Sequence, residues 1–330
     1  MIDLYSYANH RGKHRDLDIL ARWRHAYSIA YKDAQWPLAA KRLSNCGKHL
    51  EVDHYEIPGL PSFQYIRNSH SCLSRLCPIC ARSVALKSVF KLSKTITTLD
   101  WHAQGYIPLF LTLTIPAVSV TKLKPAIDNL LLAWKRFREL KQIRKAFLGT
   151  FRGLETNINQ HKQTANPHIH CLLFAHPNYF DSNAGLYLRQ KEIVRLWRHA
   201  TTISNTKVVD IRRITQNPDH HDGTNPLMGA VLETAKYCVK MTSIIEDPYG
   251  PAPTVNPMLL DHLHDALHGR RLHSYTGVLG KAAKLMNEEE EEKSGFLPEE
   301  ASRIKTEIWK WHPHIGKHTK TRTNHHNKEN

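Results

Sequence analysis

The chain has 330 residues, of which 46 are Lys or Arg and 30 are Asp or Glu, so its formal net charge is +16 with neutral His. A chain of this length can form one large domain or two to three smaller ones. The positive charge favours a polyanionic partner, either nucleic acid or an anionic membrane surface. The apolar runs are too short for the ~18 residues of a bilayer-spanning helix, so we expect no membrane partner.

The N-terminus is polar from its first residues and lacks the apolar core of a signal peptide, which predicts a cytoplasmic protein. In that reducing compartment, the six cysteines indicate metal ligands or isolated thiols rather than disulfides. The first 105 or so residues are basic, His-rich and irregular in pattern, and four of the six cysteines lie between Cys46 and Cys80. We interpret this region as a small module that is stabilised by a bound metal ion.

The spacing of these four cysteines is typical of structural zinc sites. Cys72, Cys77 and Cys80 follow one another at C-x4-C-x2-C spacing, and Cys46 lies upstream in NCGKH. A short spacer that contains Pro can bend two thiolates onto one tetrahedral Zn²⁺, and a remote pair completes the shell. Two alternatives remain open at this point. The thiols can be unrelated and buried, or one of the nearby histidines can replace a cysteine as ligand; these are His49, His54 and His70.

The elements expected after this module alternate between strands and helices. Alternation of Thr with bulky apolar residues predicts strands, and apolar residues at three- and four-residue steps predict amphipathic helices. The pattern gives strands over 109–115, 150–157, 168–175 and 207–214, and helices over 123–148, 190–201, 227–245 and 299–311. We therefore expect an α+β fold with a largely antiparallel sheet, and an appendage beyond residue 287.

The strand 168–175 begins with a pair of histidines in the segment NPHIHCLLF. Because residues i and i+2 of a strand project from the same face, His168 and His170 can chelate one cation while Ile169 and Cys171 point into the core. Two further His-x-His pairs occur, but one lies in a helix-like segment and the other flanks a Pro. Only the pair in NPHIHCLLF lies on a convincing strand.

Glu155 lies on the preceding predicted strand. If 150–157 and 168–175 form a hairpin that turns near residues 161 and 162, Glu155 faces the two histidines and can supply an oxygen ligand. Two imidazoles and a carboxylate with open positions suit Mg²⁺ or Mn²⁺ bound to a substrate phosphate. The alternative is an exposed Glu and two surface histidines on an edge hairpin.

A third group lies in the predicted helix 227–245, where Glu233, Tyr237 and Lys240 occupy positions i, i+4 and i+7 of one stripe. Attack of Tyr237 on phosphorus requires loss of the phenol proton, which costs about 4 kcal/mol at pH 7. A divalent ion on the phosphate and the Lys240 ammonium can offset that cost. The alternative is a solvated polar face on an amphipathic helix.

Together these motifs resemble the Rep_1-type plasmid rolling-circle replication initiators of the HUH endonuclease superfamily. The resemblance covers residues 40 to 285 and rests on CPICARS, LFLTLTIP, AWKRF, GLETN, NPHIHCLLF, ETAKYCVK and HGRRLHSYTGVLG, in that order. It implies a five-stranded antiparallel sheet with flanking helices and a small N-terminal zinc-binding module. It also implies nicking and joining of single-stranded DNA.

The resemblance also implies roles for individual residues. His168 and His170 match the HUH pair, Tyr237 and Lys240 match the YxxK motif, and Glu155 takes the place of an acidic third ligand. Glu233 matches an acid that some members carry before the tyrosine. Since initiation and termination need two cuts and this helix has one tyrosine, we expect Glu233 to activate water for the second cut.

The implied domain division has four parts. A basic N-terminal region with the zinc module (1–105) precedes an HUH nicking and joining domain (106–250), a C-terminal extension of that domain (251–287), and an acidic linker with a basic His-rich tail (288–330).

We therefore expect an initiator that leaves a 5′-phosphotyrosine and a free 3′-OH. Its predicted partners are origin DNA, as single strand or hairpin, and host helicase and polymerase. The alternatives are an HUH transposase or relaxase, and a zinc-dependent DNA-binding regulator without catalysis.

Overall fold

The computed structural model describes residues 17–57, 60–68, 71–204, 209–214, 226–235, 238–292, 302–312 and 317–326. The chain divides into two compact units. Among the described residues, unit 1 comprises those within 85–243 and 262–293, and unit 2 those within 3–84, 244–261 and 294–330. Whether the four predicted segments are separate domains is a different matter from this division into two units, and the four-part division stays a prediction.

Unit 1 is built on an antiparallel sheet of order β10-β5-β6-β3-β7, with the short strand β4 paired to β6. Its strands are β3 (Ile107–Thr114), β4 (Val118–Ser119), β5 (Phe147–Asn159), β6 (Thr164–Ala175), β7 (Val209–Arg213) and β10 (His273–Thr276). The predicted antiparallel α+β class is therefore confirmed. Within the described residues the sheet has six strands where five were expected, because the two residues of β4 pair with the first residues of β6.

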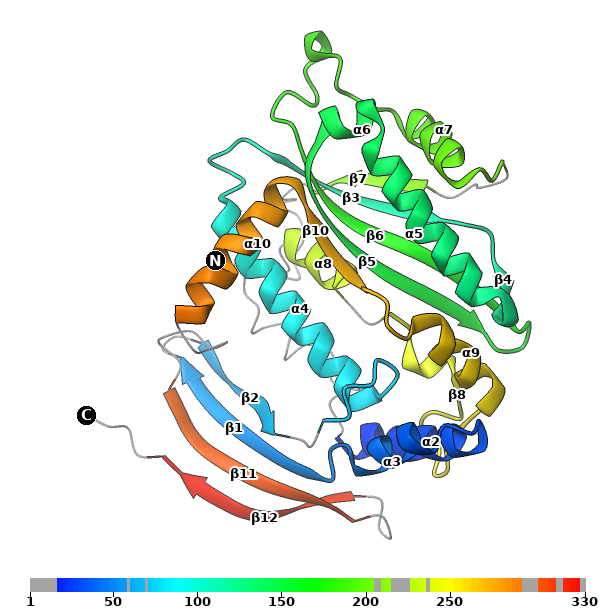
Figure 1. The fold of residues 1–330 in the computed structure, drawn as a ribbon. Coiled ribbons are helices and arrows are strands. Elements are labelled where there is room, and N and C mark those ends of the chain that lie inside the picture. The colour runs from blue at the N-terminus through cyan, green and yellow to red at the C-terminus, as the bar shows by residue number, and fades with distance from the viewer. Residues whose placement is uncertain are drawn as a thin grey trace. The chain divides into compact units, whose positions relative to one another are not determined.

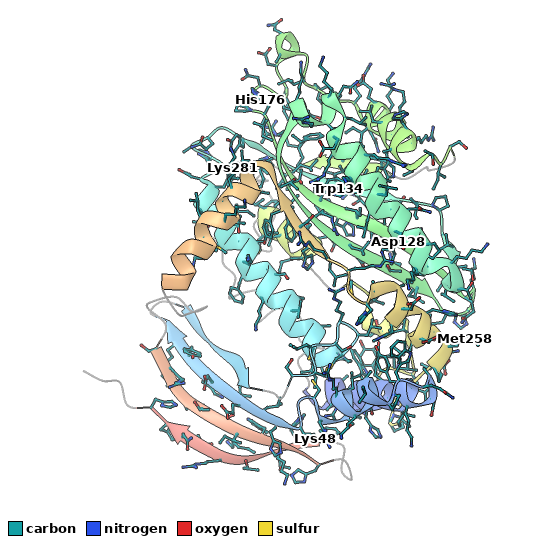
Figure 2. All side chains as sticks on the ribbon, viewed as in Figure 1. Lys48, Asp128, Trp134, His176, Met258 and Lys281 are labelled. Atoms are coloured by element: carbon teal, nitrogen blue, oxygen red, sulfur yellow. The ribbon has the colours of Figure 1, made fainter. Side chains whose placement is uncertain are left out.

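The helices of unit 1 cover both faces of this sheet (Figure 1). They are α5 (Leu123–Glu139), α6 (Lys141–Ala146), α7 (Gln190–Thr201), α8 (Pro226–Thr234), α10 (Gly277–Glu292) and parts of α4 (Pro78–Leu99) and α9 (Pro257–Leu267). Figure 2 labels Trp134 and Asp128 on α5, which illustrate its two sides, since Trp134 is buried and Asp128 is exposed. This division is the one that the apolar spacing of 123–137 predicts.

Two predicted helices of unit 1 end earlier than expected. The helix predicted over 123–148 is interrupted at Leu140, whose backbone is extended (φ −59°, ψ 134°), and Phe147 already begins β5. The helix predicted over 227–245 ends at Thr234. Beyond it the Cys238 carbonyl accepts a hydrogen bond from the Thr156 amide of β5, and Val239 bridges Thr156. Pairing with β5 therefore replaces helical hydrogen bonds that the local sequence favoured.

Unit 2 contains a second antiparallel sheet of order β12-β11-β1-β2 and a small β8-β9 pair. Its elements are α2 (Leu17–Asp33), α3 (Pro37–Asn45), β1 (His49–Ile57), β2 (Leu60–Asn68), β8 (Ile245–Glu246), β9 (Thr254–Val255), β11 (Ser302–His312) and β12 (Lys317–His325). The N-terminal region is therefore regular, contrary to its irregular sequence pattern. The residues beyond 302 are not an appendage, because β11 pairs with β1 along its length.

The helix predicted over 299–311 is wrong, since these residues form β11 where they are described. Cross-strand polar contacts explain the strand. The Thr306 hydroxyl donates to Asp53 Oδ1 at 2.5 Å, and Glu307 Oε2 lies 3.2 Å from His54 Nε2. Burial opposes ionisation of Glu307, but Lys305 and His54 outweigh it and lower its pKa to about 2. Both partners on β1 lie about 250 residues upstream, so no local pattern could reveal them.

No helix within the described ranges is both long and apolar enough to cross a bilayer.

Candidate metal centres

Glu155, His168 and His170 lie together on the β5–β6 hairpin of unit 1. The hairpin register pairs Glu155 with His168 and Gly153 with His170, which puts all three side chains on one face of the sheet. The Nε2 atoms of His168 and His170 lie 3.4 Å and 3.1 Å from Glu155 Oε2. All three residues are at most 8% exposed. An exposed edge hairpin, the alternative reading of these residues, is therefore wrong.

The donor atoms suit a small divalent ion. Ligands about 2.1 Å from Mg²⁺ and at right angles to each other lie about 3.0 Å apart, close to the distances observed here. The three ligand atoms lie within 4.8 Å of one another. The neighbouring Ile169 and Cys171 are fully buried, as the strand alternation predicted.

Both imidazoles are oriented by hydrogen bonds on their other nitrogen. His168 Nδ1 lies 3.1 Å from the Asn166 carbonyl, which can only accept, so Nδ1 carries the proton and the lone pair of Nε2 faces Glu155. His170 Nδ1 lies 3.1 Å from the Thr112 hydroxyl of β3, and its ring stacks on Phe110. Such contacts fix tautomer and ring angle in metal-binding histidines.

Glu233 lies at the C-terminal end of α8 and also approaches this cluster. Its Oε1 is 3.6 Å from His170 Nε2, and its side chain is 46% exposed, unlike that of the buried Glu155. The carboxylate therefore borders the cluster on its solvent side.

Glu233 and Lys240 do not lie on one helix as predicted, because α8 ends at Thr234. Lys240 is exposed beyond the helix, and its carbonyl accepts hydrogen bonds from Ser243. Tyr237 lies outside the described residues. Cys238, its neighbour in sequence, is hydrogen bonded to Thr156, which directly follows Glu155 on β5.

Two other tyrosines in or near the sequence motifs, Tyr275 and Tyr249, lie within the described residues. Tyr275 on β10 packs against Phe151 with ring centroids 4.7 Å apart, and burial raises its pKa, which opposes formation of the phenolate. Tyr249 of unit 2 is half exposed and packs edge-on against Trp23.

The four cysteines form a second cluster, in unit 2. Cys46 ends α3, Cys72 lies in the loop after β2, and Cys77 and Cys80 lie at the start of α4. Their sulfur atoms lie within 4.8 Å of one another, with three Sγ–Sγ distances of 3.5, 3.6 and 3.6 Å. Zn–S bonds of 2.3 Å in a tetrahedron separate the sulfurs by about 3.8 Å, whereas a disulfide needs about 2.05 Å. The spacing therefore fits a Cys₄ metal site better than disulfides.

A buried cation adjoins the cysteine cluster. Arg24 of α2 is 2% exposed, and its Nη1 donates to the Cys46 carbonyl at 2.5 Å, while its guanidinium lies 5.7 Å from the Trp311 ring centre. Within the described ranges no carboxylate forms an ion pair with Arg24. A buried charge requires a counter-charge. Four thiolates around one Zn²⁺ carry a net charge of −2 and would supply it.

The sequence reasoning missed Arg24 and Thr112. Arg24 lies on the buried stripe of α2, at helical spacing from Leu20, Tyr27 and Tyr31. A charged residue on an apolar stripe was the available signal. Thr112 gave no separate signal, because its alternation in LFLTLTI is equally typical of any half-buried strand.

Comparison with known proteins identifies the family of this chain. The family model described as "Replication protein" matches residues 63–321. The chain is 33% identical to a "Protein rep" of Bacillus amyloliquefaciens over 286 residues, which cover 84% of this chain and 81% of that protein. It is 27% identical to a "Protein rep" of Streptococcus pneumoniae serotype 2 over 282 residues, with the same coverage. No solved structure matches the chain. The chain therefore belongs to the Rep_1 family of plasmid replication initiators.

Proposed function

We propose that this initiator is an HUH-type endonuclease that nicks and rejoins one strand of its plasmid origin. The observation that carries the proposal is the convergence of His168 and His170 Nε2 on Glu155 Oε2. The antiparallel order β10-β5-β6-β3-β7 supports the HUH fold. The names of the relatives favour a replicon over a transposon or a relaxase.

Glu155, His168 and His170 would hold Mg²⁺ or Mn²⁺ at the active site. A bound divalent ion polarises a phosphate oxygen and stabilises charge that develops on it. The chain itself contributes the fixed tautomer of His168, through the Asn166 carbonyl, and the ring position of His170, through Thr112. These contacts orient the ligands before DNA binds.

Tyr237 is the proposed nucleophile. Its phenolate oxygen forms a bond to the scissile phosphorus as the bond from phosphorus to the 3′-oxygen breaks, and the released oxygen takes up a proton to become the 3′-OH. The hydrogen bond from Thr156 to Cys238 supports this role, because it ties the residue after Tyr237 to the strand that carries Glu155. The exposed Lys240 would offset the phenolate charge or the charge of the phosphate.

Glu233 is proposed to activate water for the cut that ends replication. Its separation of 3.6 Å from His170 Nε2 and its half-exposed side chain support a base that reaches both water and the scissile phosphate. Hydrolysis of the second junction would consume one water and release the DNA end as a phosphate, without a second protein–DNA bond. Host polymerase and helicase would act on the 3′-OH and the unwound strand.

The metal site predicts a specific pattern of losses. His170→Ala and Glu155→Gln should abolish Mn²⁺-dependent nicking of single-stranded origin DNA, and Thr112→Val should weaken Mn²⁺ binding about 10–100-fold. Isothermal titration measures the affinity, and a nicking assay measures the activity. His262→Ala serves as control, because it removes a histidine from α9. Normal nicking by both His170→Ala and Glu155→Gln would contradict the HUH assignment and favour a regulator without catalysis.

The two roles open to Glu233 give different results. Glu233→Ala should retain the first nick and the covalent adduct but lose clean termination, and a replication assay should then accumulate multimeric single strands. Loss of the first nick, together with weaker Mn²⁺ binding, would instead make Glu233 a metal ligand. Termination at the parental rate would exclude the hydrolytic role.

We also propose that Cys46, Cys72, Cys77 and Cys80 hold a structural zinc ion, with Arg24 as its counter-charge. The sulfur spacing supports the ligand set, and the buried guanidinium supports an anionic cluster beside it. The Cys46 carbonyl, to which Arg24 donates, joins the two groups directly.

Purified reduced protein should contain one zinc ion per chain, and Cys77→Ser should remove it. Arg24→Met should accelerate zinc loss to a chelator and lower the unfolding temperature, with partial rescue by Arg24→Lys. Arg22→Met is the matched control, since Arg22 lies on the same helix and donates to the Gly250 carbonyl instead. Zinc-free protein that unfolds at the parental temperature would contradict the proposal.

A further inference from the structure

Unit 1 contains a strongly basic cavity whose lining residues take no part in the proposed nicking chemistry. It has a volume of about 610 Å³ and lies along β10, with α4 and α10 contributing the rest of its wall. Among the described side chains, four cations and no carboxylate line it; the cations are Lys91, Arg271, Lys281 and Lys284. Figure 2 labels Lys281 on α10.

These cations differ from other exposed basic residues of the same unit. Lys124, Arg189 and Arg212 each have a carboxylate partner within 3.3 Å, and Arg270 pairs with Asp128. By contrast, no carboxylate among the described side chains of unit 1, which end at Met286 on α10, forms an ion pair with Arg271, Lys281 or Lys284. All three are exposed. Like charges converge on one cavity at a cost that an anionic ligand would relieve.

The cavity also offers neutral hydrogen-bonding groups. Ser274 and Thr276 of β10 are among its lining residues, and of these the Thr276 hydroxyl is hydrogen bonded to the Thr150 hydroxyl. β10 is an outer strand of the sheet, paired with β5 on one side only in the described structure. An outer strand presents unpaired backbone N–H and C=O groups. Cations combined with hydroxyl and amide donors are the usual recognition set for phosphodiesters.

The cavity lies close to the metal-binding face. His273 of β10 pairs with Gly153, two residues from Glu155 along β5, so their Cα atoms lie about 8 Å apart by strand geometry. By the same register His273 and Tyr275, which line the cavity, project from the sheet face that carries Glu155.

We propose that this cavity binds the phosphodiester backbone of the single-stranded DNA that flanks the nick site. Its volume falls in the range of pockets for compact ligands and is too small to enclose a duplex. The inference rests on the proposed nicking function and deepens it. It assigns Arg271, Lys281 and Lys284 to DNA positioning, while the metal cluster carries the chemistry.

The test compares two triple variants that remove the same charge. The cavity variant removes three exposed cations that line the cavity and carries Arg271→Ala, Lys281→Ala and Lys284→Ala. The control variant removes three exposed cations elsewhere in unit 1 and carries Lys124→Ala, Arg189→Ala and Lys191→Ala. Fluorescence anisotropy in EDTA measures binding of single-stranded origin DNA, so this readout does not depend on nicking. Circular dichroism verifies that both variants are folded.

The cavity variant should bind single strands about tenfold or more weakly at low salt. Its salt slope, d log K/d log[salt], should be smaller than that of the parent by about 2, since each lost phosphate contact on a single strand removes about 0.7. The control variant should change the slope by much less. In nicking assays the cavity variant should raise KM for DNA and leave kcat near the parental value.

Equal slopes for parent and cavity variant would overturn the inference. So would a loss of duplex binding with unchanged single-strand binding, which would assign the cavity to double-stranded origin DNA. If the parent itself fails to nick, the proposed function is wrong. The metal-free binding comparison still decides whether the cavity holds single strands.

Discussion

The register of the β5–β6 hairpin is the constraint on which the candidate site depends. It pairs Glu155 with His168 and brings both histidines to one face, while Ile169 and Cys171 fill the core on the other. A slip of one residue would reverse every side chain and place two imidazoles in the core. The hydrophobic core and the contacts among Glu155, His168 and His170 therefore require the same register. Hydrogen bonds of His170 with the Thr112 hydroxyl and of His168 with the Asn166 carbonyl then fix the rings within that frame.

The structure of unit 2 depends on charged side chains that are buried within its sheet and beside the cysteine cluster. Asp53 and Glu307 are buried, and their contacts run between β1 and the C-terminal strand β11. Arg24 connects the same strand to the cysteines through Trp311 and the Cys46 carbonyl. Removal of one member of such a network leaves another charge buried and unpaired, which is strongly destabilising. The C-terminal strands are thus part of the unit that contains the cysteine cluster.

Local patterns predicted the parts of the structure whose partners are close in sequence. The hairpin of β5 and β6 could be predicted because alternation, a short turn and the His-x-His spacing agree within about 25 residues. The end of α8 could not, because Val239 pairs with Thr156, far upstream. β11 was mistaken for a helix for the same reason, since its partner strand β1 lies near the other end of the chain. The proposed nucleophile Tyr237 lies outside the described residues, so its role rests on the motif and on the contacts of Cys238.

The central claim is that covalent chemistry occurs at one tyrosine beside the β5–β6 metal cluster. Mass spectrometry of peptides from protein incubated with Mn²⁺ and single-stranded origin DNA tests it directly. We predict an oligonucleotide joined through its 5′-phosphate to the peptide that contains Tyr237, and no adduct in Tyr237→Phe, which should still bind the DNA. An undiminished adduct in that variant, or one that maps to Tyr275 or Tyr249, would contradict the account.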